Sequence, residues 1–192
     1  MKNFEIISNS HFNEHLKVLK NTALKSKKKI VEASKIVTEC LLSKGTVYWC
    51  GNGGSASDSM HLSAELIGRF KKNRMPLRSQ SLLLDPAGMT CISNDFGYEN
   101  IFSRQINGLS KSGDVLIAIS TSGKSKNIVN AIKTAKKKSL KVISLLGGTG
   151  GYCKNESDLE IIINSKSTAR IQEMHIMIGH IICDLVEKRM KL

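Results

Sequence analysis

A histidine and a glutamate four residues apart, His61 and Glu65, are the residues of this chain best placed to do chemistry. In a helix, side chains at positions i and i+4 lie one above the other on the same face. An imidazole and a carboxylate held together can move protons or bind a metal ion. Taken alone, such a pair is more often an ordinary surface pair, so its interpretation depends on the neighbouring sequence.

The segment before this helix is a candidate anion-binding turn. A short apolar run at 46–50 leads into Gly-Asn-Gly-Gly-Ser at 51–55, and a helical pattern begins at about Ser55. The free backbone N–H groups and the dipole of a helix that starts in such a turn favour a negatively charged group. The turn and the His/Glu pair together predict binding and conversion of a phosphorylated or polyhydroxylated small molecule.

A second polar turn, Ser-Thr-Ser-Gly-Lys-Ser at 120–125, follows the apolar run 115–119. It falls one residue short of a nucleotide-binding Walker A loop, because Ala118 stands where that loop requires glycine. The turn at 51–55 begins a G-x-G-x-x-A dinucleotide pattern, but the nearest candidate acidic residue, Asp85, lies 34 residues after Gly51 rather than about 20. Nucleotide hydrolysis and dinucleotide binding are therefore disfavoured.

The order of predicted elements indicates how these turns are positioned. Residues 4–44 contain no Gly or Pro and predict two helices, with a break near Lys25 to Lys28. Strands are expected at 46–50, 81–84, 115–119, 142–146 and 159–163, with intervening helices after 55, near 99–108 and up to 138, a polar turn at 94–97, and a last helix over about 167–188.

This alternation predicts an α/β fold, a three-layer, doubly wound, five-stranded parallel sheet with helices on both faces. The chain has 192 residues, which fits a single domain with a helical segment at 1–44 and an α/β core at 45–192. Ligands of such sheets bind at the carboxyl ends of the strands. Both polar turns fall at those ends, so we expect them to lie together.

The composition of the chain limits the classes of partner that we expect it to bind. The net charge of +13 suits anionic substrates, but the lysines are spread over separate segments and only one Trp and three Tyr are available for stacking, so no nucleic-acid partner is expected. No apolar run approaches the ~20 residues of a membrane span, and the start lacks an apolar signal core. Five cysteines without a Cys-x-x-Cys pair indicate reduced thiols and a cytoplasmic location. Cys50 is expected to be a small buried residue rather than a nucleophile.

Taken together, the motifs resemble the sugar-isomerase (SIS) domain family and, within it, the bacterial phosphoheptose isomerases. The likeness covers nearly the whole chain. It rests on Cys-Gly-Asn-Gly-Gly-Ser at 50–55, His-x-x-Ala-Glu-Leu-x-Gly-Arg at 61–69, Asn-Asp-Phe-Gly at 94–97, Gly-Asp-Val-Leu at 113–116, Ile-Ser-Thr-Ser-Gly-x-Ser at 119–125 and Arg-Ile-Gln-Glu-x-His at 170–175.

The resemblance implies a flavodoxin-like SIS fold and an aldose–ketose isomerase. The implied reaction converts sedoheptulose 7-phosphate to D-glycero-D-manno-heptose 7-phosphate through an enediolate, at the start of nucleotide-activated heptose synthesis for lipopolysaccharide or capsule. It also implies a homotetramer with sites at subunit interfaces. Glu65 and His180 would be the acid/base pair, and one zinc ion per subunit would be bound by His61, Glu65, Gln172 and His180. The implied substrate contacts are Asn52, Gly53, Gly54, Ser55, Glu65, Arg69, Asn94, Asp95, Ser120, Thr121, Ser122, Ser125 and Gln172.

Two of the implied zinc ligands would lie far apart on the same predicted helix. Gln172 and His180 are eight residues apart, which is roughly 12 Å along a helix. Either Gln172 lies in an irregular first turn or the ligand set crosses a subunit boundary. The remaining histidines, His11, His15 and His175, are expected to be structural or surface residues.

One departure from the family pattern keeps an alternative open. Many phosphoheptose isomerases have Asp where this chain has Ala169. A related, non-enzymatic SIS protein that binds the bacterial replication initiator also has Ala there, but it lacks the glutamate and the second histidine. Because this chain keeps Glu65 and His180, the enzyme is favoured. An isomerase of another sugar phosphate is the second alternative.

Overall fold

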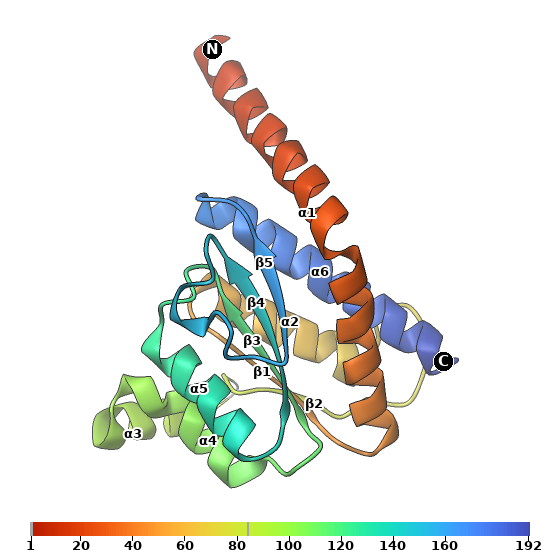
Figure 1. Ribbon diagram of the computed structural model, residues 1–192, viewed down its shortest axis with the longest axis vertical. Coiled ribbons are helices and arrows are strands. Elements are labelled where there is room, and N and C mark those ends of the chain that lie inside the picture. Colours follow the sequence, from red (N-terminus) through yellow and green to blue (C-terminus); the bar gives the residue numbers. More distant parts are fainter. Residues whose placement is uncertain (1, 84) are drawn as a thin grey trace.

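A parallel β-sheet forms the middle layer of the protein (Figure 1). The computed structural model describes residues 2–83 and 85–192. Within them, five strands pair in the order β2-β1-β3-β4-β5, all parallel. This is the flavodoxin-like doubly wound order and confirms the predicted fold class. The strands are β1 (Val47–Gly51), β2 (Ser79–Ser81), β3 (Val115–Ser120), β4 (Lys141–Gly147) and β5 (Leu159–Ile163).

Helices cover both faces of the sheet. One face packs against α1 (Lys2–Leu42), α2 (Gly54–Ile67) and α6 (Thr168–Arg189), and the other against α3 (Pro86–Phe96), α4 (Ile101–Leu109) and α5 (Lys126–Lys137). Two short 3₁₀ turns complete the chain, η1 (Tyr98–Asn100) and η2 (Gly151–Cys153). In β3, Val115 and Ile117 belong to the first core and Leu116 to the second. Burial on both faces explains the unbroken apolar runs of the central strands.

The amino-terminal segment corrects one prediction. It is one continuous helix of 41 residues, so the break expected near Lys25 to Lys28 was wrong. Lysine is a good helix former, and nothing in this run removes a backbone donor or frees the backbone as Pro or Gly would. The helix bends where it reaches the body of the protein, and its first half projects beyond the other elements (Figure 1).

The segment after β2 corrects another. Asp85 and Pro86 begin helix α3: the Asp85 side chain accepts a hydrogen bond from the Gly88 N–H at 3.0 Å, and Pro86 occupies the first turn. The polar turn predicted at 94–97 is instead the end of this helix. The strand predicted at 81–84 is displaced to Ser79–Ser81, and Leu84 lies outside the described residues.

The remaining elements match the predicted ones to within two residues at each end, and the last strand matches at both ends. Among the described residues, no helix has both the length and the apolar character that crossing a bilayer requires. The architecture places the ends of β1 and β3 next to each other, because these strands are paired directly. This is the point where the strand order reverses and where such sheets bind ligands.

Candidate active site

Three side chains from two helices meet near the carboxyl half of α2. His61 and Glu65 stand one turn apart on α2, and the His61 Nε2 lies 3.0 Å from the Glu65 Oε1. His180, from α6, places its Nε2 3.3 Å from the His61 Nε2. Glu65 and His180 are partly buried and His61 is exposed. The structure therefore joins residues that are 119 positions apart in the chain.

The spacing of these atoms fits a metal site. One ligand atom from each of His61, Glu65 and His180 lies within 4.8 Å of the other two. Two atoms that bind one zinc ion at ~2.0 Å in tetrahedral geometry lie about 3.3 Å apart. Two imidazoles and a carboxylate are a donor set that zinc accepts, with a fourth position left for another ligand. These three residues could hold the ion that the resemblance implies.

The environment of His180 favours the neutral form of its imidazole. Burial lowers the pKa of His180 below its usual value, nearby His61 lowers it further, and the carboxylate of Glu65 opposes both. The ring of Phe70 stacks on it, with centroids 5.5 Å apart and planes 19° from parallel. A neutral imidazole can bind a metal ion or accept a proton.

Gln172 lies elsewhere in the same chain. A Cβ built on Gly54 would collide with the Gln172 side-chain amide, so this amide lies against the first turn of α2. Gly54 precedes His61 by seven residues, which is about 10 Å along a helix. Helix α6 is regular from Thr168 onward, so Gln172 is not in an irregular first turn. This removes the irregular first turn as an explanation for the spacing of Gln172 and His180.

A pair of amides joins the glycine turn to the first turn of α5, which directly follows the second polar turn. The Asn52 Nδ2 donates to the Asn127 Oδ1 at 2.9 Å, and the Asn127 Nδ2 donates to the Asn52 Oδ1 at 2.8 Å. The Tyr98 hydroxyl also donates to the Asn52 Oδ1, at 2.9 Å. Sequence reasoning missed Asn127 and Tyr98. Both position Asn52, whose side-chain oxygen is already engaged before any ligand is considered.

The second polar turn has a cavity beside it. Thr121 and Ser122 line a cavity of about 350 Å³ together with Lys124, Gly147, Gly148, Thr149, Ser165, Lys166, Thr168 and Ile171. The buried Ser120 hydroxyl instead accepts from the Gly123 N–H at 3.0 Å and shapes the turn. Ser125 is the N-cap residue of α5. Lys166, after β5, adds a cation that sequence reasoning missed.

The other predicted contacts are more dispersed. Asn94 and Asp95 lie exposed in the last turn of α3, where the Asn94 Nδ2 donates to the Asp95 Oδ1 at 2.8 Å. Arg69 is exposed just after α2, next to Phe70. Gly53, Gly54 and the buried Ser55 form the first turn of α2, with Gly53 at a positive φ of 58°. Asn94, Asp95 and Arg69 are thus not linked to the triad by side-chain contacts of their own that the structure describes.

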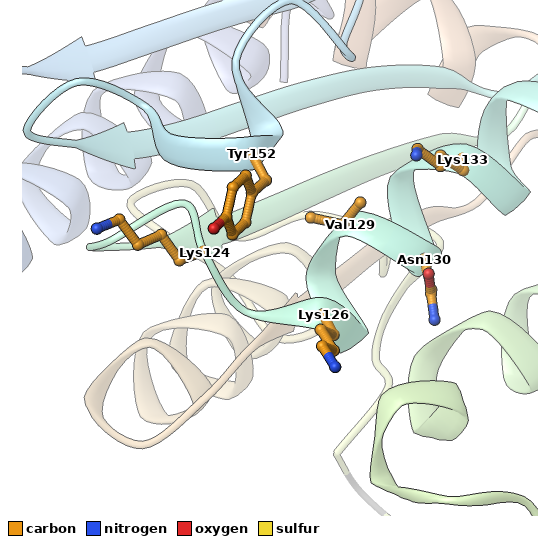
Figure 2. A pocket seen from close by; sticks show the side chains of 6 residues that line it. All are labelled: Lys124, Lys126, Val129, Asn130, Lys133 and Tyr152. Atoms are coloured by element: carbon orange, nitrogen blue, oxygen red, sulfur yellow. The ribbon is translucent and has the colours of Figure 1, made fainter.

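A larger cavity lacks side chains arranged to bind an anion. It measures about 590 Å³ and lies along α5, lined by Lys124, Lys126, Val129, Asn130, Lys133 and Tyr152 (Figure 2). The side chains of Lys124 and Lys126 point away from each other (Figure 2). The three ammonium groups do not converge on one anion position, and we assign no ligand to this cavity.

Cys50 is fully buried, as the sequence predicted. Burial raises the pKa of its thiol, so Cys50 is not a nucleophile.

Comparison with known proteins identifies the family. Residues 10–147 match the family model described as the SIS domain. The chain is 47% identical over 175 residues to a phosphoheptose isomerase from Nitratiruptor, covering 91% of this chain and 94% of the relative. It is 44% identical over 187 residues to one from Sulfurimonas denitrificans, covering 97% and 91%. The chain belongs to the phosphoheptose isomerase family of SIS-domain proteins.

Solved structures agree with this assignment to the phosphoheptose isomerase family. A phosphoheptose isomerase from Francisella tularensis superposes with a TM-score of 0.93 at 35% identity, covering 98% of this chain and all of the other. One from Neisseria gonorrhoeae gives 0.90 at 35% identity, covering 96% and 99%. The clustering of His61, Glu65 and His180 thus occurs in a chain that matches phosphoheptose isomerases over nearly its whole length.

Proposed function

We propose that this protein interconverts sedoheptulose 7-phosphate and D-glycero-D-manno-heptose 7-phosphate, with Glu65 and His180 as its acid/base pair. The observation that carries the proposal is the meeting of His61, Glu65 and His180 in a member of the phosphoheptose isomerase family. The same meeting favours an enzyme over a protein that only docks the replication initiator, for which Glu65 and His180 would have no use. Ala169 is exposed in the first turn of α6, eleven residues before His180 on the same helix.

The reaction moves two protons and changes no oxidation state overall. In the ketose-to-aldose direction, the Glu65 carboxylate removes a proton from C1 and an enediolate forms. Glu65 then returns the proton to C2, while His180 exchanges the hydroxyl proton between the oxygens on C1 and C2. Positioned proton transfer of this kind contributes about 10²- to 10⁴-fold to the rate. The partly buried position of Glu65 and the lowered pKa of His180 suit these roles.

Zinc is the metal that we propose for His61, Glu65 and His180. When bound, it would act as a Lewis acid that polarises the substrate carbonyl. We further propose that Gln172 completes the ligand set, and that it comes from a second copy of the chain because it lies against Gly54 in its own chain. A homotetramer with sites at subunit interfaces would satisfy this requirement.

The substrate would lie along the carboxyl edge of the sheet. We propose that Ser120, Thr121, Ser122 and Ser125 bind the phosphate at the cavity beside the second polar turn, where Lys124 and Lys166 add positive charge. Asn52, Gly53, Gly54, Ser55, Asn94, Asp95, Arg69 and Gln172 would contact the sugar chain. In this proposal residues 1–192 form one SIS domain, and the five free cysteines are consistent with the cytoplasm.

Turnover of sedoheptulose 7-phosphate, with and without added zinc and followed by carbon NMR of the sugar, tests the proposal directly. The expected result is an aldoheptose 7-phosphate whose formation a chelator abolishes and zinc restores. Folded, zinc-supplied protein that converts no substrate would refute the assigned reaction. Turnover that is insensitive to chelation would refute the metal.

Replacing the proposed base gives a sharper result. Glu65→Gln keeps the shape of the side chain but removes the carboxylate, so we expect kcat to fall by about 10²- to 10⁴-fold. Glu39→Gln, an exposed change on α1 away from the site, is the matched control and should leave kcat unchanged. Turnover of Glu65→Gln within about threefold of the unmodified protein would show that the base is another group.

A further inference from the structure

The loop between α2 and β2 is fastened to α6 by one buried carboxylate. Glu187 accepts hydrogen bonds from the backbone N–H groups of Phe70, Lys71 and Lys72, each at 3.1 Å, and from the Nε of Arg74 at 2.9 Å. The side chains of Arg74 and Glu187 are 2% and 3% exposed. Four donors on one carboxylate fix the course of residues 70–74 along α6.

Arg74 extends this hydrogen-bond network to the candidate active site. Its Nη2 donates to the backbone oxygen of Glu65 at 2.9 Å, and its Nη1 donates to that of Leu66 at 2.9 Å. These carbonyls belong to the last turn of α2, where an α-helix leaves carbonyl groups without partners of its own. Arg74 therefore connects the turn that carries Glu65 to Glu187 on α6.

Phe70 is the point where the fastened loop touches the site. Its backbone is bound to Glu187, and its ring stacks on His180. His180 and Glu187 are seven residues apart, so they lie two turns apart on one face of α6. The stacked ring covers one face of the imidazole, while the Nε2 edge points to His61.

We propose that Phe70 is a positioning residue for His180, and that Glu187 and Arg74 hold Phe70 in place. The inference rests on the proposed function, in which His180 binds zinc and exchanges protons with the substrate. A ring that is stacked on one side resists rotation about its side-chain torsions. The network thus couples the orientation of His180 on α6 to the position of Glu65 on α2.

A purely structural role for Phe70 is the competing explanation, since it also packs against the core of the α1–α2–α6 face. Leu77 distinguishes the two. It belongs to the same loop, is partly buried against the same core, and its N–H donates to the Leu66 oxygen at 3.1 Å. Leu77→Ala removes packing from the loop without removing the ring on His180, so it is the matched control for Phe70→Leu.

The test compares Phe70→Leu, Phe70→Tyr and Leu77→Ala. Mutating a residue that contacts a metal-binding histidine from outside the ligand set changes activity by about 10- to 100-fold. We therefore expect Phe70→Leu to lower kcat by about that factor, with KM little changed. Phe70→Tyr keeps the stacked ring and should restore kcat. In metal-free protein with labelled histidines, NMR should show the nuclear Overhauser contact between His61 and His180 lost in Phe70→Leu and kept in the other two.

Equal kcat values for Phe70→Leu and Leu77→Ala would overturn the inference, and so would a His61–His180 contact that survives in Phe70→Leu. The NMR measurement needs neither substrate nor metal. If the unmodified protein fails to convert sedoheptulose 7-phosphate, the proposed function fails while this contact still decides whether Phe70 positions His180.

Discussion

The buried histidine of α6 is a residue whose charge the fold excludes. His175 is fully buried, and its Nε2 lies 3.1 Å from the Leu146 oxygen at the end of β4. Its Nδ1 has no partner in the described structure. Burial lowers the pKa of His175 to about 4, against the opposing effect of the hydrogen bond to Leu146. This agrees with the expectation that His175 is structural.

His175 makes a prediction about stability at acidic pH. Because its pKa is lower in the folded than in the unfolded protein, the unfolded chain binds more protons between about pH 6.5 and 4. Its contribution is complete above that window and is lost as the pH falls through it, by at most about 3 kcal/mol. His175→Gln removes the titration and keeps an amide donor for Leu146, so its unfolding free energy should depend less on pH.

Urea unfolding at a series of pH values checks this prediction. His11→Gln, an exposed change on α1, is the control and should follow the pH dependence of the unmodified protein. Parallel curves for His175→Gln and the unmodified protein would show that another group causes the loss of stability in acid.

At the scale of residues, the sequence predicted what lies close along one helix and not what tertiary packing brings together. His61 and Glu65 were recognisable as a pair from their spacing alone. His180 entered only through the family resemblance, since the contact between α2 and α6 has no local signal. Arg74 and Glu187 carried no signal either, because an ion pair that is buried between a loop and a helix looks in sequence like ordinary surface charge.

At the scale of elements, the buried ion pair of Arg74 and Glu187 predicts where the loop 68–78 is most sensitive. Burial would raise the pKa of Glu187, but the hydrogen bonds from Lys71, Phe70 and Lys72 and the guanidinium of Arg74 outweigh it and lower the pKa. Removing the charge by Glu187→Gln leaves Arg74 buried without a counter-ion. We expect a loss of about 3–5 kcal/mol in the free energy of unfolding, measured in urea.

Asp184→Asn is the control for this change. Asp184 lies on the same helix and pairs with Lys71 and Lys188, whose side chains are largely exposed. Pairs of this kind contribute at most about 1 kcal/mol. If both variants lost the same small amount of stability, the carboxylate of Glu187 would not be the anchor of the loop.

The two segments whose structure was predicted wrongly contain local signals for the structure that they adopt. The strand predicted at 81–84 runs up to Asp85 and Pro86, but Asp before Pro is also a helix start, and here Asp85 is the N-cap of α3. The break predicted near Lys25 to Lys28 does not occur, because lysine in a helix costs little. In both segments, the structure follows the backbone preferences of the residues and not their polarity.

At the scale of the whole molecule, the topology explains why two turns that are distant in the chain lie together. β1 and β3 are neighbours in the sheet although β2 lies between them in the chain. Their carboxyl ends open at one edge, where Asn52 and Asn127 form their reciprocal amide pair. The net charge of +13 favours the approach of anionic ligands to the molecule.

The projecting half of α1 predicts association of several chains. Its apolar side chains Phe4, Ile6, Ile7, Phe12 and Leu16 are 47–77% exposed, which is more apolar surface than one short helical segment usually leaves in water. A homotetramer would bury these side chains and could bring Gln172 of one copy to the triad of another. We expect the protein to sediment at about four times its chain mass of 21.1 kDa.

Replacing Phe4 and Phe12 together by Ser should dissociate this assembly without unfolding the core, because neither side chain belongs to it. Tyr152→Ser, which removes an exposed aromatic ring from η2, is the matched control and should keep the assembly. Since the fourth zinc ligand would be lost with the partner, zinc affinity should fall on dissociation as measured by competition with a chelating dye. A dissociated variant that binds zinc as tightly as the intact assembly would show that one chain supplies every ligand.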